Sequence, residues 1–155
     1  MKTSFLIDSN VLISSYDKTE KQHKRSYALM EQAMNGRAEA ALAHQNLLEY
    51  LAVVTDPKRV EYPLPLEETL VNIDVYTASL IVVFPKSTTV AVLKELLKVK
   101  SVTKTKIFDL YLAATALDNG IARICTWNIS DFEGIPKIEV VTPEQIIDDV
   151  LKNRR

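Results

Sequence analysis

Four acidic residues lie in or directly beside apolar segments of the sequence, where a charged side chain needs a reason. They are Asp8 after the apolar run 5–7, Glu49 within 47–54, Asp109 within 107–117, and Asp131 shortly after the mostly apolar segment 122–126. Burying an ionised carboxylate costs free energy unless the group is paired with a cation or coordinates a metal. Together these acids therefore favour a metal site.

Each of the four acids, taken alone, also has a structural explanation. Asp8 opens a polar segment, 8–10, with the chemistry of a helix N-cap. Glu49 is compatible with a salt bridge to a nearby lysine or arginine. Asp109 stands at the start of a predicted helix, where the helix dipole stabilises an acid, and Asp131 lies in a segment that suits a turn. The metal hypothesis depends on whether the fold brings the four together.

Carboxylates gathered without cations raise one another's pKa, and hard divalent cations remove that penalty. Oxygen ligands suit Mg²⁺ or Mn²⁺, whereas zinc favours histidine or cysteine. The two histidines, His23 and His44, are not at a ligand spacing. The sequence therefore predicts magnesium or manganese as the cofactor rather than zinc.

The elements that must position these acids alternate between short apolar runs and longer helical patterns, which indicates an α/β fold with a mainly parallel sheet. The predicted strands are Phe5–Ile7, Ala38–Ala43, Leu80–Phe84, Ala122–Thr126 and Ile138–Val141. The predicted helices are Val11–Tyr16, Lys21–Met34, Gln45–Thr55, Leu66–Ser79, Thr88–Val99, Ile107–Asn119 and Pro143–Lys152. Helices should cover both faces of such a sheet, and ligands bind beyond the carboxyl ends of its strands.

Length and composition are those of one globular domain. The 155 residues fit a single domain, 1–155, and 47% of them are hydrophobic. The single cysteine, Cys125, forms no intrachain disulfide and is expected to be buried, which favours the cytoplasm. Since no apolar segment is long enough for a signal peptide or a membrane span, we expect a soluble protein with no membrane partner.

The net charge of −1 excludes a general basic field for nucleic acid, so such contacts must come from local clusters. Each cluster of basic residues is equally compatible with a solvated helix face. The clusters are Lys18, Lys21, Lys24 and Arg25; Lys58 and Arg59; and Lys98, Lys100, Lys104 and Lys106. The first and last flank Asp8 and Asp109 in sequence, which favours them as phosphate contacts.

Four segments resemble the conserved blocks of PIN domains, and the closest likeness is to the VapC-type toxins of bacterial and archaeal toxin–antitoxin pairs. They are Phe5–Leu12, Leu47–Tyr50, Phe108–Leu117 and Thr126–Phe132. The resemblance covers most of the chain, from about Phe5 to Pro143. It implies a PIN-like, Rossmann-like fold with three α/β/α layers and a central sheet of four or five strands.

By this resemblance, Asp8 and Asp109 are expected to be the principal metal ligands, and Glu49 completes an acidic triad. The implied activity is the hydrolysis of RNA phosphodiester bonds with Mg²⁺ or Mn²⁺, without a protein nucleophile. It also implies a small antitoxin partner, which inserts a basic side chain into the acidic site, and a homodimer.

The resemblance further assigns supporting roles. Thr126 would place a hydroxyl near the metal or phosphate, and Asn10 would orient Asp8. Where many relatives carry an aspartate, this chain has Asn128, with Asp131 three residues later. The role of Asp131 as a fourth catalytic acid, and a second metal, thus stay open.

Acidic residues in an α/β fold are also typical of three other kinds of protein. A phosphoacceptor receiver domain needs adjacent acids after the first strand, and a haloacid-dehalogenase-like phosphatase needs an aspartate at position 10, which is Asn10. Both conflict with the sequence. A PIN fold that binds RNA or protein without cutting stays open, since a fold does not guarantee an activity.

Overall fold

The computed structural model describes residues 4–154. Its five strands are β1 (Phe5–Ile7), β2 (Ala40–Ala43), β3 (Ile81–Val83), β4 (Arg123–Cys125) and β5 (Glu139–Val141). They form one sheet in the order β3-β2-β1-β4-β5, and every neighbouring pair is parallel. The predicted α/β fold is confirmed, with a sheet that is entirely rather than mainly parallel. Because β1 lies between β2 and β4, the strand order reverses beside it.

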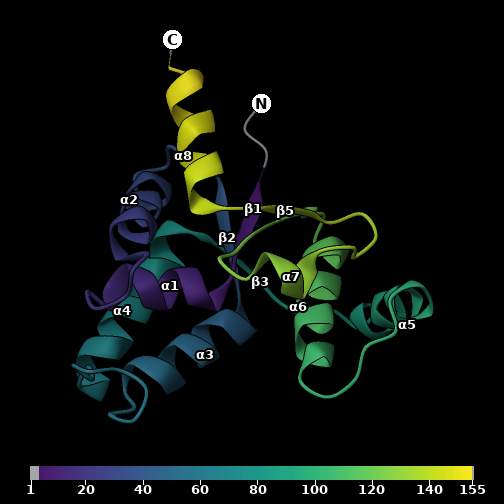
Figure 1. Ribbon diagram of the computed structural model, residues 1–155, viewed down its shortest axis with the longest axis horizontal. Helices are drawn as coiled ribbons and strands as arrows, with labels where there is room; N and C mark the ends of the chain where they lie inside the picture. The colour runs from purple at the N-terminus through teal and green to yellow at the C-terminus, as the bar shows by residue number, and fades with distance from the viewer. Residues whose placement is uncertain (1–3, 155) are drawn as a thin grey trace.

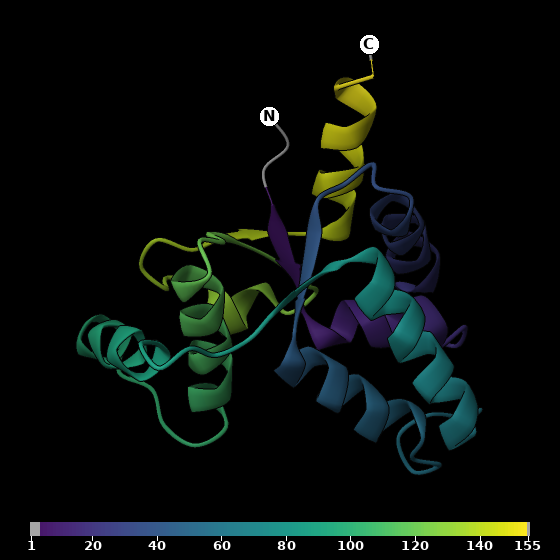
Figure 2. The ribbon, with the colours of Figure 1, turned by 180° about the vertical axis from the view of Figure 1, so that it is seen from behind.

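Eight helices of the described residues surround the sheet. They are α1 (Ser9–Tyr16), α2 (His23–Met34), α3 (His44–Val54), α4 (Leu66–Ser79), α5 (Thr89–Val99), α6 (Lys106–Asp118), α7 (Ile129–Phe132) and α8 (Pro143–Lys152). The helices α5, α6 and α7 pack on one face, and the others pack on the opposite face (Figure 1). The view from behind shows the same two groups on either side of the strands (Figure 2). The result is the expected three-layer arrangement.

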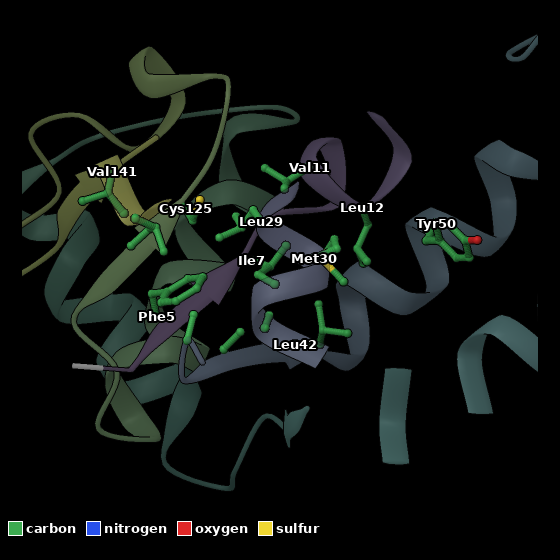
Figure 3. Packing of buried hydrophobic residues seen from close by; sticks show 14 of the residues in the cluster. Phe5, Ile7, Val11, Leu12, Leu29, Met30, Leu42, Tyr50, Cys125 and Val141 are labelled. Atoms are coloured by element: carbon green, nitrogen blue, oxygen red, sulfur yellow. The ribbon is translucent and has the colours of Figure 1, made fainter. Parts of the chain in front are cut away.

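The two cores follow from the alternation of side chains along the central strand. Phe5 and Ile7 point into the core that includes Leu29 and Met30 of α2, whereas Leu6 points into the core on the α6 side. Figure 3 shows Phe5 and Ile7 among the helices of the first core. All three residues of β1 are buried, so the end of this strand is held rigidly on both faces.

Local signals explain several element ends. Asp8 accepts a hydrogen bond from the backbone N–H of Ser9 and is the N-cap of α1, so this helix begins two residues earlier than predicted. Gly120 follows α6 with a φ of 76°, a conformation that favours glycine and ends the helix. The alanine-rich β2 is a strand despite low intrinsic propensity, because it pairs on both edges and is buried on both faces.

Two features differ from the prediction. The one-turn helix α7, which contains Asp131, was not predicted, and it buries Phe132. The exposure of Leu48 was not predicted: this residue lies in the apolar segment 47–54, yet it is 66% exposed on the outer side of α3. No helix within residues 4–154 has the length and apolar character needed to cross a membrane.

Candidate active site at the carboxyl ends of the strands

The carboxyl ends of the three central strands lead directly into the predicted site residues. Asp8 follows β1, Thr126 follows β4, and Glu49 lies on α3, which begins immediately after β2. The backbone N–H of Asp8 donates to the carbonyl of Cys125, so the ends of β1 and β4 are tied together. The site therefore occupies the edge at which parallel α/β sheets bind ligands.

Asp8 is a buried carboxylate with hydrogen bonds to both oxygens. The backbone N–H of Ser9 donates to Oδ1 over 2.8 Å, and the Thr126 hydroxyl donates to Oδ2 over 2.8 Å. Burial raises the pKa of Asp8 to about 6, against the lowering effect of these hydrogen bonds, and the charges of Glu49 and Asp109 raise it further. A cation bound beside Asp8 would remove the cost of keeping this carboxylate ionised.

Glu49 is held beside Asp8 by two polar side chains. The Ser9 hydroxyl donates to Oε2 of Glu49 and lies 3.5 Å from Oδ1 of Asp8, so it bridges the two carboxylates. Gln45 donates from Nε2 to Oε1 of Glu49 over 3.0 Å. Glu49 is thus turned toward the strand edge. It forms no salt bridge with any lysine or arginine of residues 4–154, so that alternative explanation of Glu49 is wrong.

Asp109 stands half-buried in the first turn of α6, close enough to Asp8 and Glu49 for their charges to interact. Burial is the largest cause that raises the pKa of Asp109, and the charge of the nearby Asp131 raises it further. The positive charges of Lys106 and Lys100 lower this pKa. The structure thus brings Asp8, Glu49 and Asp109 into one electrostatic group.

Asp131 occupies a different position in this group. Its carboxylate forms an ion pair with Lys106, the first residue of α6. The pair joins α7 to α6 beside Asp109. The structure therefore places Asp131 against Asp109 with a cationic partner of its own, unlike Asp8.

Thr126 is the centre of a network of polar groups. Its Oγ1 accepts hydrogen bonds from Nδ2 of Asn10 and from the backbone N–H of Asn128, each over 3.0 Å, while it donates to Asp8. The Asn10 amide is fixed in turn by the backbone N–H of Trp127, which donates to Oδ1 over 3.2 Å. Asn10 was expected to orient Asp8, and the structure links the two side chains only indirectly, through the hydroxyl of Thr126. Asn128 contributes its backbone, and its side chain is exposed.

The donor set fits a hard divalent cation. No group of three or more histidine, cysteine, aspartate or glutamate side chains in residues 4–154 is arranged to enclose a metal on its own. Mg²⁺ keeps several water ligands and is commonly bound through one or two carboxylates. Asp8, Glu49 and Asp109 offer oxygen donors of that kind at one edge, and no lysine, arginine or histidine of residues 4–154 forms an ion pair with Asp8.

The basic residues named from the sequence are divided among several roles. Arg25 pairs with Glu144 of α8 over 2.9 Å, and Lys106 pairs with Asp131. Six further lysines of these clusters are exposed: Lys18, Lys21, Lys24, Lys58, Lys98 and Lys104. The first cluster lies around the start of α2, whereas Lys106 and Lys100 lie close enough to Asp109 to lower its pKa.

A cavity of about 350 Å³ lies at the opposite, amino-terminal ends of the strands. It is lined by Phe5, Arg123 and Asp149, among other residues. Arg123 already has Glu139 at 3.0 Å and Asp149 at 3.5 Å as ionic partners. This charge balance, and its position away from the carboxyl edge, separate the cavity from the acidic group.

A family model described as the PIN domain matches residues 5–136, most of the chain. The chain belongs to the PIN domain family. The resemblance inferred from the four sequence blocks is therefore confirmed. No curated protein sequence gives a significant match.

Solved structures of other PIN proteins share the fold at low sequence identity. The VapBC2 complex of Rickettsia felis, bound to promoter DNA, is 18% identical with a TM-score of 0.65, covering 90% of this chain and 98% of that one. FitAcB of Neisseria gonorrhoeae is 16% identical with a TM-score of 0.64 and the same coverage. A Mycobacterium tuberculosis VapC toxin described as cleaving the sarcin–ricin loop is 12% identical, with a TM-score of 0.60, covering 87% and 98%.

Two residues of the site received little or no weight from the sequence. They are Ser9 and Gln45, neither of which is among the site residues predicted from the sequence. The signal for Gln45 was its position four residues before Glu49, which places both on one face of a helix. The contact of Ser9 with Glu49 spans 40 positions, and no local pattern encodes it.

Proposed function

We propose that this PIN domain protein is an endoribonuclease that depends on Mg²⁺ or Mn²⁺, and that it is the toxin of a toxin–antitoxin pair. The observation that carries the proposal is the state of Asp8. It is a buried carboxylate with a pKa raised to about 6, beside Glu49 and Asp109, and no lysine, arginine or histidine of residues 4–154 forms an ion pair with it. Family membership supports a nuclease rather than another use of an acidic edge.

In the proposed mechanism, Asp8, Glu49 and Asp109 would hold the metal through carboxylate oxygens. A divalent cation bound there lowers the pKa of a water molecule and offsets the charge that develops on the phosphoryl group. Thr126 and Ser9 keep the two strand-edge carboxylates in fixed orientations. Asp131 and Lys106 form an ion pair beside Asp109, and their charges have opposite effects on the pKa of Asp109. No side chain acts as a nucleophile in this scheme.

The proposed partner is a small antitoxin. Several solved structures of this fold are complexes of such pairs, including a toxin–antitoxin complex from Klebsiella pneumoniae. The acidic edge favours a partner that presents a lysine or arginine side chain to Asp8 and its neighbours. A homodimer in the cytoplasm is part of the same proposal, with RNA as the substrate.

The test uses purified, partner-free protein and a mixed RNA pool with Mg²⁺ or Mn²⁺. The comparison includes EDTA, the Asp109→Asn variant, and Asp74→Asn as a matched control on the exposed side of α4. Cleavage that needs metal, is lost in Asp109→Asn and persists in Asp74→Asn would support the proposal. Folded protein that neither cleaves RNA nor binds metal would instead favour the second candidate, a PIN module that binds without cutting. That candidate is favoured by the absence of an enclosed three-ligand metal shell among residues 4–154.

A further inference from the structure

Phe108 is an exposed aromatic residue on the edge of the acidic group. It lies in the first turn of α6, between Lys106 and Asp109, and 63% of its surface is exposed. No aromatic ring of residues 4–154 packs against it. Phe84, by contrast, packs on His44 with ring centroids 4.1 Å apart. The Phe108 ring therefore offers a free π-face at this edge of the molecule.

The backbone of Phe108 is tied to the site through one side chain. Gln45 donates from Nε2 both to the carbonyl of Phe108, over 3.3 Å, and to Oε1 of Glu49, over 3.0 Å. Phe108 directly precedes Asp109, so the Cα atoms of the two residues are about 3.8 Å apart. Successive helical side chains point about 100° apart. The ring therefore extends from the same helical turn as Asp109, on a neighbouring side of α6.

Charge alone gives this region little attraction for RNA. The net charge of the chain is −1, and the acidic group repels phosphates until a cation is bound. Lys106 is paired with Asp131, and Lys100 donates to the carbonyl of Glu133, so part of the nearby positive charge is already engaged. Base stacking on an aromatic ring does not depend on charge and accepts any base.

We propose that Phe108 is a stacking platform for an unpaired base next to the phosphate that is cut. This assignment rests on the proposed function and adds to it a residue that would hold the RNA beside the point of cleavage. The exposed Lys104, four residues before Phe108, is placed to contact a backbone phosphate of the same strand. The unpaired base would stack on the ring, next to the carboxylates that would hold the metal.

The experiment compares RNA binding in the Asp109→Asn background, in which the RNA stays intact. Fluorescence anisotropy with a labelled single-stranded oligoribonucleotide would measure Kd for the parent, Phe108→Ala and Phe108→Tyr. Tyr62→Ala is the matched control, since Tyr62 is 67% exposed and lies beyond the far end of α3. Circular dichroism would establish that each variant folds.

We expect Phe108→Ala to weaken binding roughly 5- to 100-fold, the range for losing one base–aromatic stack. Phe108→Tyr and Tyr62→Ala should bind as the parent does. An abasic nucleotide moved along the oligonucleotide should weaken binding at one position in the parent and have no effect there in Phe108→Ala. In the catalytically active background, Phe108→Ala should raise KM more than it lowers kcat.

Unchanged RNA affinity in Phe108→Ala would overturn the inference. It would favour a protein segment, rather than an RNA base, as the group that packs on the Phe108 ring. Equal weakening in Phe108→Ala and Phe108→Tyr would also overturn it. A parent protein that binds no RNA would refute the proposed function and the stacking role together. That result is distinguishable, since it appears before any change at position 108.

Discussion

The hydroxyl of Thr126 donates a 2.8 Å hydrogen bond to Oδ2 of Asp8, and this bond joins residues 118 positions apart in the chain. Both residues directly follow strands that pair with each other in the sheet. The same hydroxyl accepts from Asn10 and from the backbone N–H of Asn128, so its hydrogen-bonding capacity is filled. The orientation of Asp8 is therefore set by strand pairing and by one threonine.

Replacing Thr126 by valine should destabilise the protein and disturb Asp8. The change leaves buried polar groups of Asp8 and Asn10 without their partner, which costs about 1–3 kcal/mol. It also removes an interaction that lowers the pKa of Asp8, so this pKa should rise further. Urea denaturation in EDTA would measure the free energy of unfolding. Thr126→Ser, which keeps the hydroxyl, should retain most of the stability, and equal losses in both variants would contradict the assignment.

Asp8→Asn should remove most of the pH dependence of stability in the metal-free protein. The pKa of Asp8 is about 6 in the folded state and 3.8 in the unfolded reference. A raised folded pKa stabilises the fold below pH 3.8, and this contribution is lost as the pH rises through 6. The difference corresponds to about 3 kcal/mol at neutral pH.

The measurement is the free energy of unfolding across this pH range in EDTA, for the parent, Asp8→Asn and the exposed control Asp74→Asn. The parent and the control should lose stability between about pH 4 and pH 6. Asp8→Asn should show a flatter profile and no nuclease activity. A profile for Asp8→Asn as steep as that of the parent would show that another group titrates.

Magnesium should stabilise the parent more at pH 7 than at about pH 5, because the proton on Asp8 competes with the cation at the lower pH. The readout is the shift in Tm on adding MgCl₂, with CaCl₂ and NaCl at matched ionic strength as controls. Asp8→Asn should show a smaller shift at both values. An equal shift in the parent at both pH values would place the ion away from Asp8.

Asp131→Asn and Asp109→Asn should differ in severity. Loss of Asp109 removes a proposed ligand and should lower kcat/KM roughly a thousandfold. Loss of Asp131 removes the partner of Lys106 and should lower kcat/KM roughly 10- to 100-fold. This is the range for residues that contact metal ligands without binding the metal themselves. The same change lowers the pKa of Asp109 toward its ordinary value. Kinetics on one RNA substrate would settle the order, and equal losses would place Asp131 among the ligands.

The sequence predicted those parts of the site that depend on local patterns. The buried strand before Asp8 and the helix beginning beside Asp109 were recognisable from short apolar runs and end signals. The helix α7 was not, because four residues are too few for a periodic pattern, and it is stabilised by the burial of Phe132 and the pairing of Asp131.

Contacts between distant segments could not be predicted from spacing. The bridge from Ser9 to Glu49 and the double hydrogen bond of Gln45 exist only once α3 lies beside β1 and α6. The exposure of Leu48 was missed for a related reason. An apolar run shows which residues avoid water on average, and it does not show which face of a helix lacks a neighbour.

The central place of β1 in the sheet has a consequence for protein synthesis. Residues of the first third of the chain supply Asp8 and Glu49, but the strand on the other side of β1 begins only at Arg123. A nascent chain that has not yet released β4 from the ribosome lacks Thr126 and has no partner for half of its first strand. If the proposed activity holds, the acidic group cannot take its final arrangement until Asp109 and Thr126 have also left the ribosome.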